Sequence, residues 1–158
     1  MNKQAQFEQF LALSSAITGY NRLDLLGTGV AWDYFSTINE IVGEVICLDL
    51  WLEIQKILSE NLEETKIDLA IRLELLSSEK FGPVVRNLIK LWYLGQWDEL
   101  PSGWRQHFGQ STRDINFIIS ASSYKSGLIW DAIGAHPMGA RQTGFGTWSH
   151  PPRPPEFD

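Results

Sequence analysis

The chain of 158 residues has a single cysteine, which excludes an internal disulfide. The sequence therefore does not call for an oxidising compartment. Cys47 lies within an apolar run beside Val45, Ile46 and Leu48. This setting predicts a buried, unreactive thiol rather than a nucleophile.

Long apolar runs and targeting signals are also lacking. No run approaches the roughly 20 apolar residues that a membrane-spanning helix needs. The opening stretch MNKQAQFEQF has neither the basic-then-apolar layout of a secretory signal nor a twin arginine. From the sequence as written we expect a cytoplasmic protein with no direct membrane span.

Clustered basic residues are scarce, and the net charge is −6. Residues 24–79 contain twelve acidic side chains and three basic ones, whereas residues 80–158 contain eight basic and six acidic. Phosphate backbones are bound by clustered lysine and arginine, so this distribution argues against a nucleic-acid partner.

Catalytic and metal-binding spacings are missing as well. The three histidines, His107, His136 and His150, form no pair at metal-ligand spacing, and Cys47 is remote from them. The stretch SSYK places Lys125 three residues after Ser122, the spacing of one class of serine nucleophile, but its companion motifs are absent. A free-standing Ser/Lys enzyme is kept as an alternative; a capping serine with a solvated lysine is the simpler interpretation.

Helical periodicity is what the sequence does contain. Apolar residues recur at steps of three and four in five segments, each of which predicts a helix. The first spans 4–18, the second is capped by Thr28 and interrupted at Gly43, and the third follows Gly43. The fourth spans 65–76, and the fifth runs from Pro83, which suits a first helical turn, to Gly95. The stretch NRLDLLGTG (21–29) is expected to form a turn. The predicted buried stripes are Phe7, Phe10, Leu11, Ser14 and Ile17; Val30, Tyr34, Ile38 and Ile41; Ile46, Leu50, Ile54 and Ile57; Ile67, Ile71 and Leu75; and Val84, Leu88, Leu91 and Trp92.

The chain changes character beyond Gly95. Residues 95–114 are rich in turn formers, 115–120 (INFIIS) are the one β-like run, and 122–133 predict a short helix. Five of the seven prolines lie at or after Pro137. The fold class is therefore all-α: a compact bundle of about five to six helices over 1–135, followed by an extended Gly/Pro/aromatic tail over 136–158.

Four stretches carry a resemblance to a known family. They are FLALSSAITGY (10–20), LIKLWYLGQW (88–97), YKSGLIWDAIG (124–134) and HPMGARQTGFGTWSHPP (136–152). In this order they resemble the small subunit of membrane-associated, FAD-dependent sugar and polyol dehydrogenases, of the sorbitol and fructose dehydrogenase type, akin to the gluconate dehydrogenase small subunit.

The resemblance implies a subunit that is not an enzyme on its own and binds no cofactor. In that family the small subunit binds a glucose–methanol–choline-type flavoprotein, which carries FAD and oxidises the sugar, and it helps that subunit mature. A cytochrome c subunit often accepts the electrons. Family members usually bear a twin-arginine segment, so a periplasmic location in the complex is the alternative to a cytoplasmic one. A helical adaptor for an unrelated partner is the other alternative.

The tail fits such a role, because proline lowers the entropy cost of lying extended on another surface. Phe145 and Trp148 would be its anchors. The predicted partner-binding residues are Trp130, His136, Pro137, Arg141, Phe145, Trp148, Pro151, Pro152, Pro154 and Pro155. The competing expectation is that the tail folds back on the bundle and covers Trp92 or Trp97.

Overall fold

The computed structural model describes residues 1–60, 63–109 and 111–140, and it confirms an all-α fold. The bundle consists of α1 (Lys3–Thr18), α2 (Arg22–Gly27), α3 (Ala31–Val42), α4 (Glu44–Ser59), α5 (Glu64–Ala70), which continues as the π-helix η1 (Ile71–Leu76), and α6 (Gly82–Leu94). The later elements are β1 (Gln96–Trp97), α7 (Ser102–Phe108), β2 (Phe117–Ile118), α8 (Ala121–Lys125) and α9 (Ile129–Ala132).

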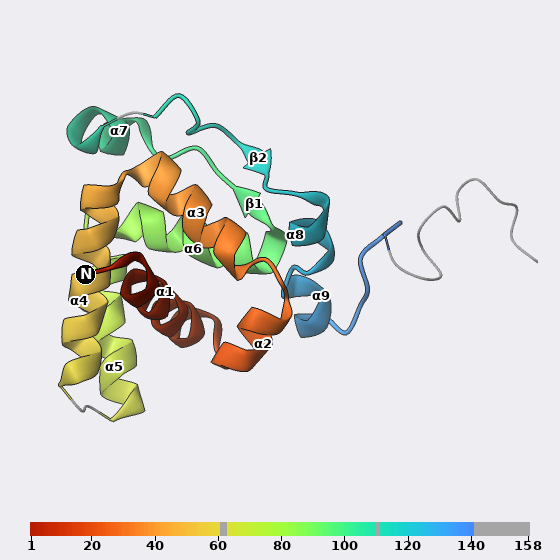
Figure 1. Ribbon diagram of the computed structural model, residues 1–158, viewed down its shortest axis with the longest axis horizontal. Helices are drawn as coiled ribbons and strands as arrows, with labels where there is room; N and C mark the ends of the chain where they lie inside the picture. Colours follow the sequence, from red (N-terminus) through yellow and green to blue (C-terminus); the bar gives the residue numbers. More distant parts are fainter. Residues whose placement is uncertain (61–62, 110, 141–158) are drawn as a thin grey trace, which may run out of the picture.

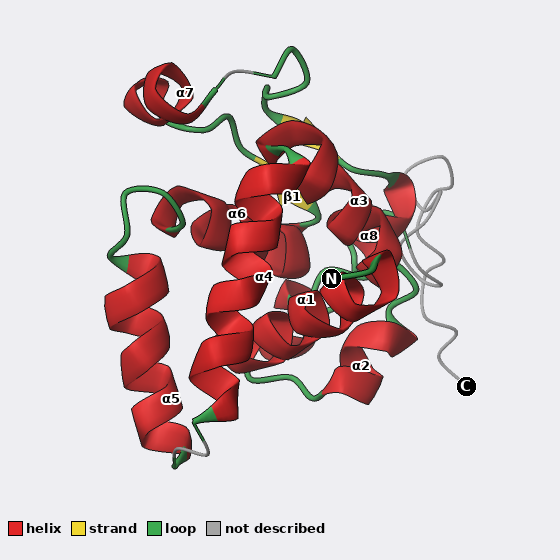
Figure 2. Ribbon diagram, turned by 60° about the vertical axis from the view of Figure 1, so that its left-hand side comes forward, coloured by secondary structure: helices red, strands yellow, loops and turns green. Residues whose placement is uncertain are grey.

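The bundle is arranged around α1 and α6. Helix α1 packs against α3, α4 and α6, and α3 also packs against α4 and α6. In Figure 1, α4 and α5 form one edge of the molecule, and α8 and α9 lie at the opposite edge. Figure 2, coloured by secondary structure, shows α5 beside α4, away from the elements that follow α6.

The core contains nearly all residues of the predicted stripes. Among them only Ile17, Ile46 and Ile67 are partly exposed. Aromatic rings fill its centre: Phe10 packs on Phe35, Trp51 and Trp92, with ring centroids 5.6–6.0 Å apart. Trp97 is fully buried too. The expectation that the tail covers Trp92 or Trp97 concerns residues that lie outside the described part of the chain.

The sole cysteine belongs to this core. Cys47 is fully buried, as predicted, and burial raises the pKa of its thiol to about 12. Its sulfur contacts the carbonyl of Ile38 at 3.7 Å.

The chain between α1 and α3 is a helix rather than the predicted turn. The side chain of Asn21 accepts hydrogen bonds from the amides of Leu23 and Asp24, at 2.9 and 3.0 Å, and so starts α2. Thr28 does not cap α3, because its hydroxyl donates to the carbonyl of Leu25 (2.6 Å) and closes α2 instead.

The predicted helix over 122–133 is two short helices, α8 and α9, separated near Gly127. The β-like run pairs in a two-residue antiparallel ladder, Gln96 with Ile118 and Trp97 with Phe117. Residues 102–108, expected to be turns, form α7.

Candidate functional site

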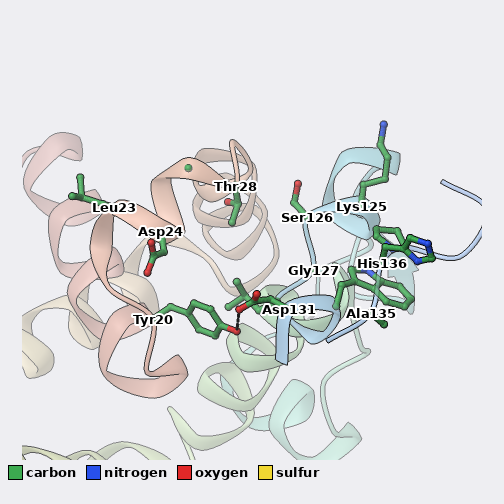
Figure 3. A pocket seen from close by; sticks show the side chains of 14 residues that line it. Tyr20, Leu23, Asp24, Thr28, Lys125, Ser126, Gly127, Asp131, Ala135 and His136 are labelled. Atoms are coloured by element: carbon green, nitrogen blue, oxygen red, sulfur yellow. Dashed lines mark hydrogen bonds between the residues drawn. The ribbon is translucent and has the colours of Figure 1, made fainter. Parts of the chain in front are cut away.

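A groove of about 650 Å³ lies between α2 and the segment that follows α8. Clefts of this size are typical of binding sites. Figure 3 shows Leu23, Asp24 and Thr28 on one wall, and Lys125, Ser126, Ala135 and His136 on the other. The full lining is Tyr20, Leu23, Asp24, Gly27, Thr28, Lys125, Ser126, Gly127, Leu128, Trp130, Asp131, Ala135, His136 and Pro137.

One hydrogen bond ties the two walls together. The hydroxyl of Tyr20, just after α1, donates to a carboxylate oxygen of Asp131 on α9 at 2.8 Å (Figure 3). This hydrogen bond, helped by desolvation, raises the pKa of Tyr20 to about 12, because ionisation would place a phenolate beside the carboxylate. The phenol is therefore a neutral donor at ordinary pH.

The second wall is set against α6 by a close backbone contact. A Cβ added to Gly127 would lie 2.6 Å from the carbonyl oxygen of Tyr93, so the position needs a glycine. The next amide, of Leu128, donates to the carbonyl of Trp92 at 2.9 Å.

The end of α6 is fitted against α8 in the same manner. Gly95 has φ +68°, and a Cβ there would lie 2.6 Å from the backbone of Ser123. Ser120 and Ser123 form a reciprocal capping box that starts α8, and the Ser123 hydroxyl also reaches the Gly95 carbonyl at 3.2 Å. Residues 120–128 are thus fixed to the C-terminal end of α6.

Residues 130–138 form a ridge beside the groove. The indole N–H of Trp130 donates to the carbonyl of Tyr124 at 2.8 Å, and the two rings meet edge to face. On the other side of the ridge lies a second depression of about 660 Å³, lined by Trp130, Ile133, Gly134, Ala135, His136 and Met138. Ile133 and Met138 are 61% and 67% exposed, so an apolar surface is open to a partner there.

The structure places three of the predicted partner-binding residues at this site. Trp130 and His136 line both depressions, and Pro137, which is buried, lines the groove. Arg141, Phe145, Trp148, Pro151, Pro152, Pro154 and Pro155 lie outside the described residues.

The other wall of the groove was not predicted as part of a site. Leu23, Asp24 and Thr28 were expected to be turn and cap residues. Leu23 is 80% exposed, the highest value among the large apolar residues that the structure describes, but the sequence carries no signal of this exposure. An apolar side chain on a six-residue helix has no periodic pattern that would reveal its exposure.

The Ser/Lys pair is on the surface of α8. Ser122 and Lys125 are both exposed, whereas the neighbouring Ser123 is the buried serine and has a structural role in the capping box. The predicted capping function thus belongs to Ser120, not Ser122. Within the described residues no group of three or more His, Cys, Asp or Glu side chains could hold a metal ion.

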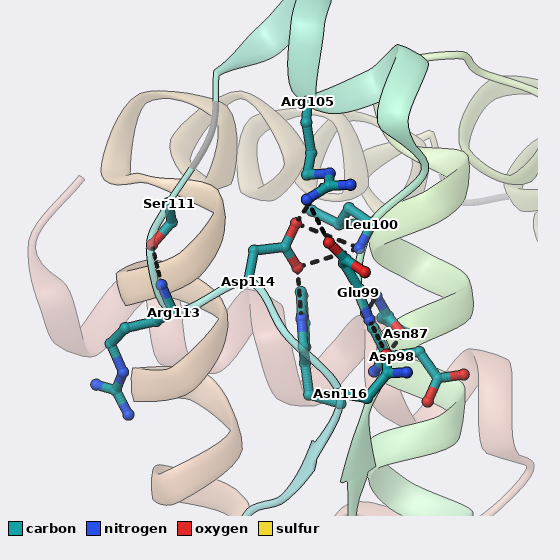
Figure 4. Close-up of polar contacts among 10 residues, drawn as sticks. Asn87, Asp98, Glu99, Leu100, Arg105, Ser111, Arg113, Asp114 and Asn116 are labelled. Carbon is teal, nitrogen blue, oxygen red and sulfur yellow. Dashed lines mark hydrogen bonds and ion pairs between the residues drawn. The ribbon is translucent and has the colours of Figure 1, made fainter.

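A buried carboxylate organises the segment between β1 and β2. Asp114 accepts from the indole N–H of Trp97 (2.9 Å) and from the amide of Leu100 (3.1 Å), with Arg105 4.0 Å away (Figure 4). Asn87 reaches the same segment, because its amide donates to the carbonyl of Asp98 at 2.7 Å. None of these residues lines the groove, and the network holds the two-stranded ladder on the bundle.

No family model, no curated protein and no solved structure matches this sequence. Among the described residues, no helix has the length and apolar character needed to cross a bilayer.

Proposed function

We propose that this chain is the non-catalytic small subunit and maturation chaperone of an FAD-dependent sugar or alcohol dehydrogenase. Its partner would be a glucose–methanol–choline-type flavoprotein that carries the FAD, with a cytochrome c subunit as a further partner. The proposal starts from the four stretches that resemble the small subunits of such enzymes. A contact surface, rather than an active site, is the property that these stretches should share.

The observation that carries the proposal is that the first, third and fourth stretches line one groove, and that the second stretch contacts the first and the third. Tyr20, which ends the first stretch, hydrogen-bonds to Asp131 of the third. Tyr93, from the second, donates to the carbonyl of Thr18 in the first at 3.0 Å. Tyr124, from the third, donates to the carbonyl of Met138 in the fourth at 3.3 Å.

The longest of these contacts joins residues 111 positions apart in the sequence, and most of the residues involved lie outside the apolar core. The core is built by the apolar stripes of α1, α3, α4 and α6, and it includes little of the groove wall. Residues gathered outside the core around an open depression are typical of a recognition surface. The bound partner would contact the groove, the ridge and the predicted anchors of the tail.

Co-expression with a flavoprotein of this class tests the proposal. The two chains should co-purify in a fixed ratio, with the FAD in the larger one. Two folded chains that fail to associate would contradict it.

A charge placed in the groove tests which face is used. Leu23→Arg changes an exposed side chain on the groove wall, and it should weaken the complex at least tenfold because it puts a charge into a desolvated contact. Leu52→Arg, on α4 at the opposite edge of the molecule, is the matched control, since Leu52 is 49% exposed. If the two variants bind the flavoprotein with equal affinity, the groove is not part of the interface.

Deletion of residues 136–158 tests the tail. It should weaken the complex while leaving the helical circular dichroism signal nearly unchanged, because the helices and core lie before residue 136. A truncated chain that binds as tightly as the full chain would remove the tail from the interface.

A further inference from the structure

We infer that residues 119–138, which we call the strap, open from the bundle as one unit while the bundle stays folded, and that the groove exists only while the strap is closed. This inference concerns the free chain and does not rest on the proposed function.

The strap has few contacts with the apolar core. Among the described residues, Leu128 is the only strap residue that belongs to the buried core, and Ile119 is the only other one that packs against it. Helix α1, although shorter than the strap, buries four apolar side chains, those of Phe7, Phe10, Leu11 and Leu13. Because burial of apolar surface is the main stabilising contribution to folding, the strap is held more weakly than the helices of the bundle.

Hydrogen bonds attach the strap to the C-terminal end of α6. The amide of Leu128 donates to the carbonyl of Trp92 at 2.9 Å. The amide of Ile119 donates to the carbonyl of Gly95 at 3.0 Å, and the hydroxyl of Ser123 donates to the same carbonyl at 3.2 Å. All three acceptor contacts lie within the last turn of one helix and its cap, so a single displacement of the strap breaks them together.

A side-chain hydrogen bond attaches the strap to the end of α1. The hydroxyl of Tyr20 donates to the carboxylate of Asp131 at 2.8 Å, in an exposed position. Water competes for both groups there, so this hydrogen bond adds only modestly to the stability of the closed strap.

Within itself the strap is well connected. The indole N–H of Trp130 donates to the carbonyl of Tyr124 at 2.8 Å, and the hydroxyl of Tyr124 donates to the carbonyl of Met138 at 3.3 Å. The amide of Ala135 donates to the carbonyl of Trp130 at 2.8 Å. These hydrogen bonds join α8, α9 and the residues after them without involving the bundle. The strap should therefore detach as one cooperative unit rather than residue by residue.

Opening of the strap would remove one wall of the groove. The lining residues Leu23, Asp24 and Thr28 stay with the bundle, whereas all lining residues from Lys125 to Pro137 belong to the strap. Figure 3 shows the two sets of side chains on opposite sides of the depression. The fraction of closed molecules therefore limits the binding of any ligand that contacts both walls.

Native-state hydrogen exchange of the full chain, followed by NMR, tests the opening. The amides of Ile119 and Leu128 report on the strap, and those of Leu13 in α1 and Leu88 in α6 report on the bundle. After correction for intrinsic rates, we expect the strap amides to exchange roughly a hundredfold faster than the bundle amides, or more. Equal protection of the two sets would mean that the strap opens only when the whole chain unfolds, and it would overturn the inference.

Two core substitutions separate local opening from global unfolding. Ile54 is buried in α4, at the opposite edge of the molecule from α8 and α9 (Figure 1). Ile54→Val destabilises the bundle whether the strap is open or closed, so it should speed exchange of the bundle amides roughly twofold or more and leave the strap amides unchanged. Leu128→Ala removes the core contact of the strap and should speed exchange of the Ile119 amide roughly tenfold or more. Strap amides that respond to Ile54→Val as the bundle does, or an Ile119 amide that ignores Leu128→Ala, would refute the inference.

Addition of the flavoprotein separates the inference from the proposed function, on which this part of the experiment rests. A subunit bound across both walls of the groove should hold the strap closed and slow the exchange of its amides. Fast strap exchange in a chain that binds no flavoprotein would keep the strap and refute the proposed function. A stable complex formed by a chain whose free strap is protected as well as the bundle would do the reverse.

Discussion

Replacement of Gly127 by alanine should destabilise the protein by about 2 kcal/mol. The new Cβ would lie 2.6 Å from the carbonyl oxygen of Tyr93, a backbone atom that cannot rotate away. Overpacking of this kind costs about 1–3 kcal/mol. Separation of the two segments would also weaken the hydrogen bond from the Leu128 amide to the Trp92 carbonyl, worth about 1 kcal/mol. Alanine also lowers the conformational entropy of the unfolded chain, which offsets about 0.4–1 kcal/mol of this destabilisation.

Urea unfolding followed by tryptophan fluorescence measures this change. For a chain of this size the loss corresponds to a fall in Tm of about 4–8 °C. Gly103→Ala is the matched control, because Gly103 lies in α7 with nothing within 4 Å of the added Cβ, and it should be neutral or slightly stabilising. A Gly127→Ala protein as stable as the native one would refute the close contact on which the second wall of the groove depends.

Three further predictions concern single side chains. Tyr20→Phe removes the hydrogen bond to Asp131. The stability that this hydrogen bond contributes should be fully present below pH 10, the ordinary tyrosine pKa, and should be lost as the pH rises through about 12. Urea unfolding of the native protein and the variant at several pH values measures this difference. Cys47 should react with iodoacetamide at neutral pH only as fast as the chain unfolds, because its thiol is buried and its pKa is raised to about 12; rapid labelling of the folded chain would contradict this. Asp114→Ala should cost about 2–4 kcal/mol in thermal or urea unfolding, since it leaves the indole N–H of Trp97 and a backbone amide buried without an acceptor; Asp114→Asn, which keeps an acceptor oxygen, should cost clearly less.

Much of the bundle could be predicted because its helices are long enough to show a period. In α6 the residues Val84, Leu88, Leu91 and Trp92 fall on one face, and each is at most 1% exposed. Gly95, predicted to end that helix, adopts the left-handed conformation with φ +68°. Burial of a continuous apolar stripe dominates the energetics of such helices, so the sequence pattern and the structure agree.

Short elements could not be predicted in this way. Helix α2 has six residues, fewer than two turns, and it depends on the side-chain cap of Asn21 rather than on an apolar stripe. The break between α8 and α9 has a tertiary cause, the approach of Gly127 to the backbone of α6. Neither feature leaves a periodic trace in the sequence.

Four of the seven tryptophans lie in the core of the structure. Trp51, Trp92 and Trp97 are at most 1% exposed, and Trp104 is 5% exposed. Among the described residues, Trp32 is the most exposed at 46%, and Trp130 is partly buried at the ridge. Tryptophan content by itself therefore does not indicate a binding partner. Whether a tryptophan is available to a partner depends on where its ring lies in the fold.

The candidate site was half predictable for a related reason. Trp130, His136 and Pro137 stand out in a segment without periodicity, whereas the facing wall belongs to α2, about a hundred residues earlier. The two walls meet because the second one is placed by α6: Gly95 and Gly127 let the α8–α9 segment approach the helix end closely. A residue behind the groove can thus control the shape of its surface. If the proposed partner binds this surface, Gly127→Ala should reduce the affinity even at temperatures where the variant is fully folded. If the partner binds only the tail, the substitution should leave the affinity unchanged.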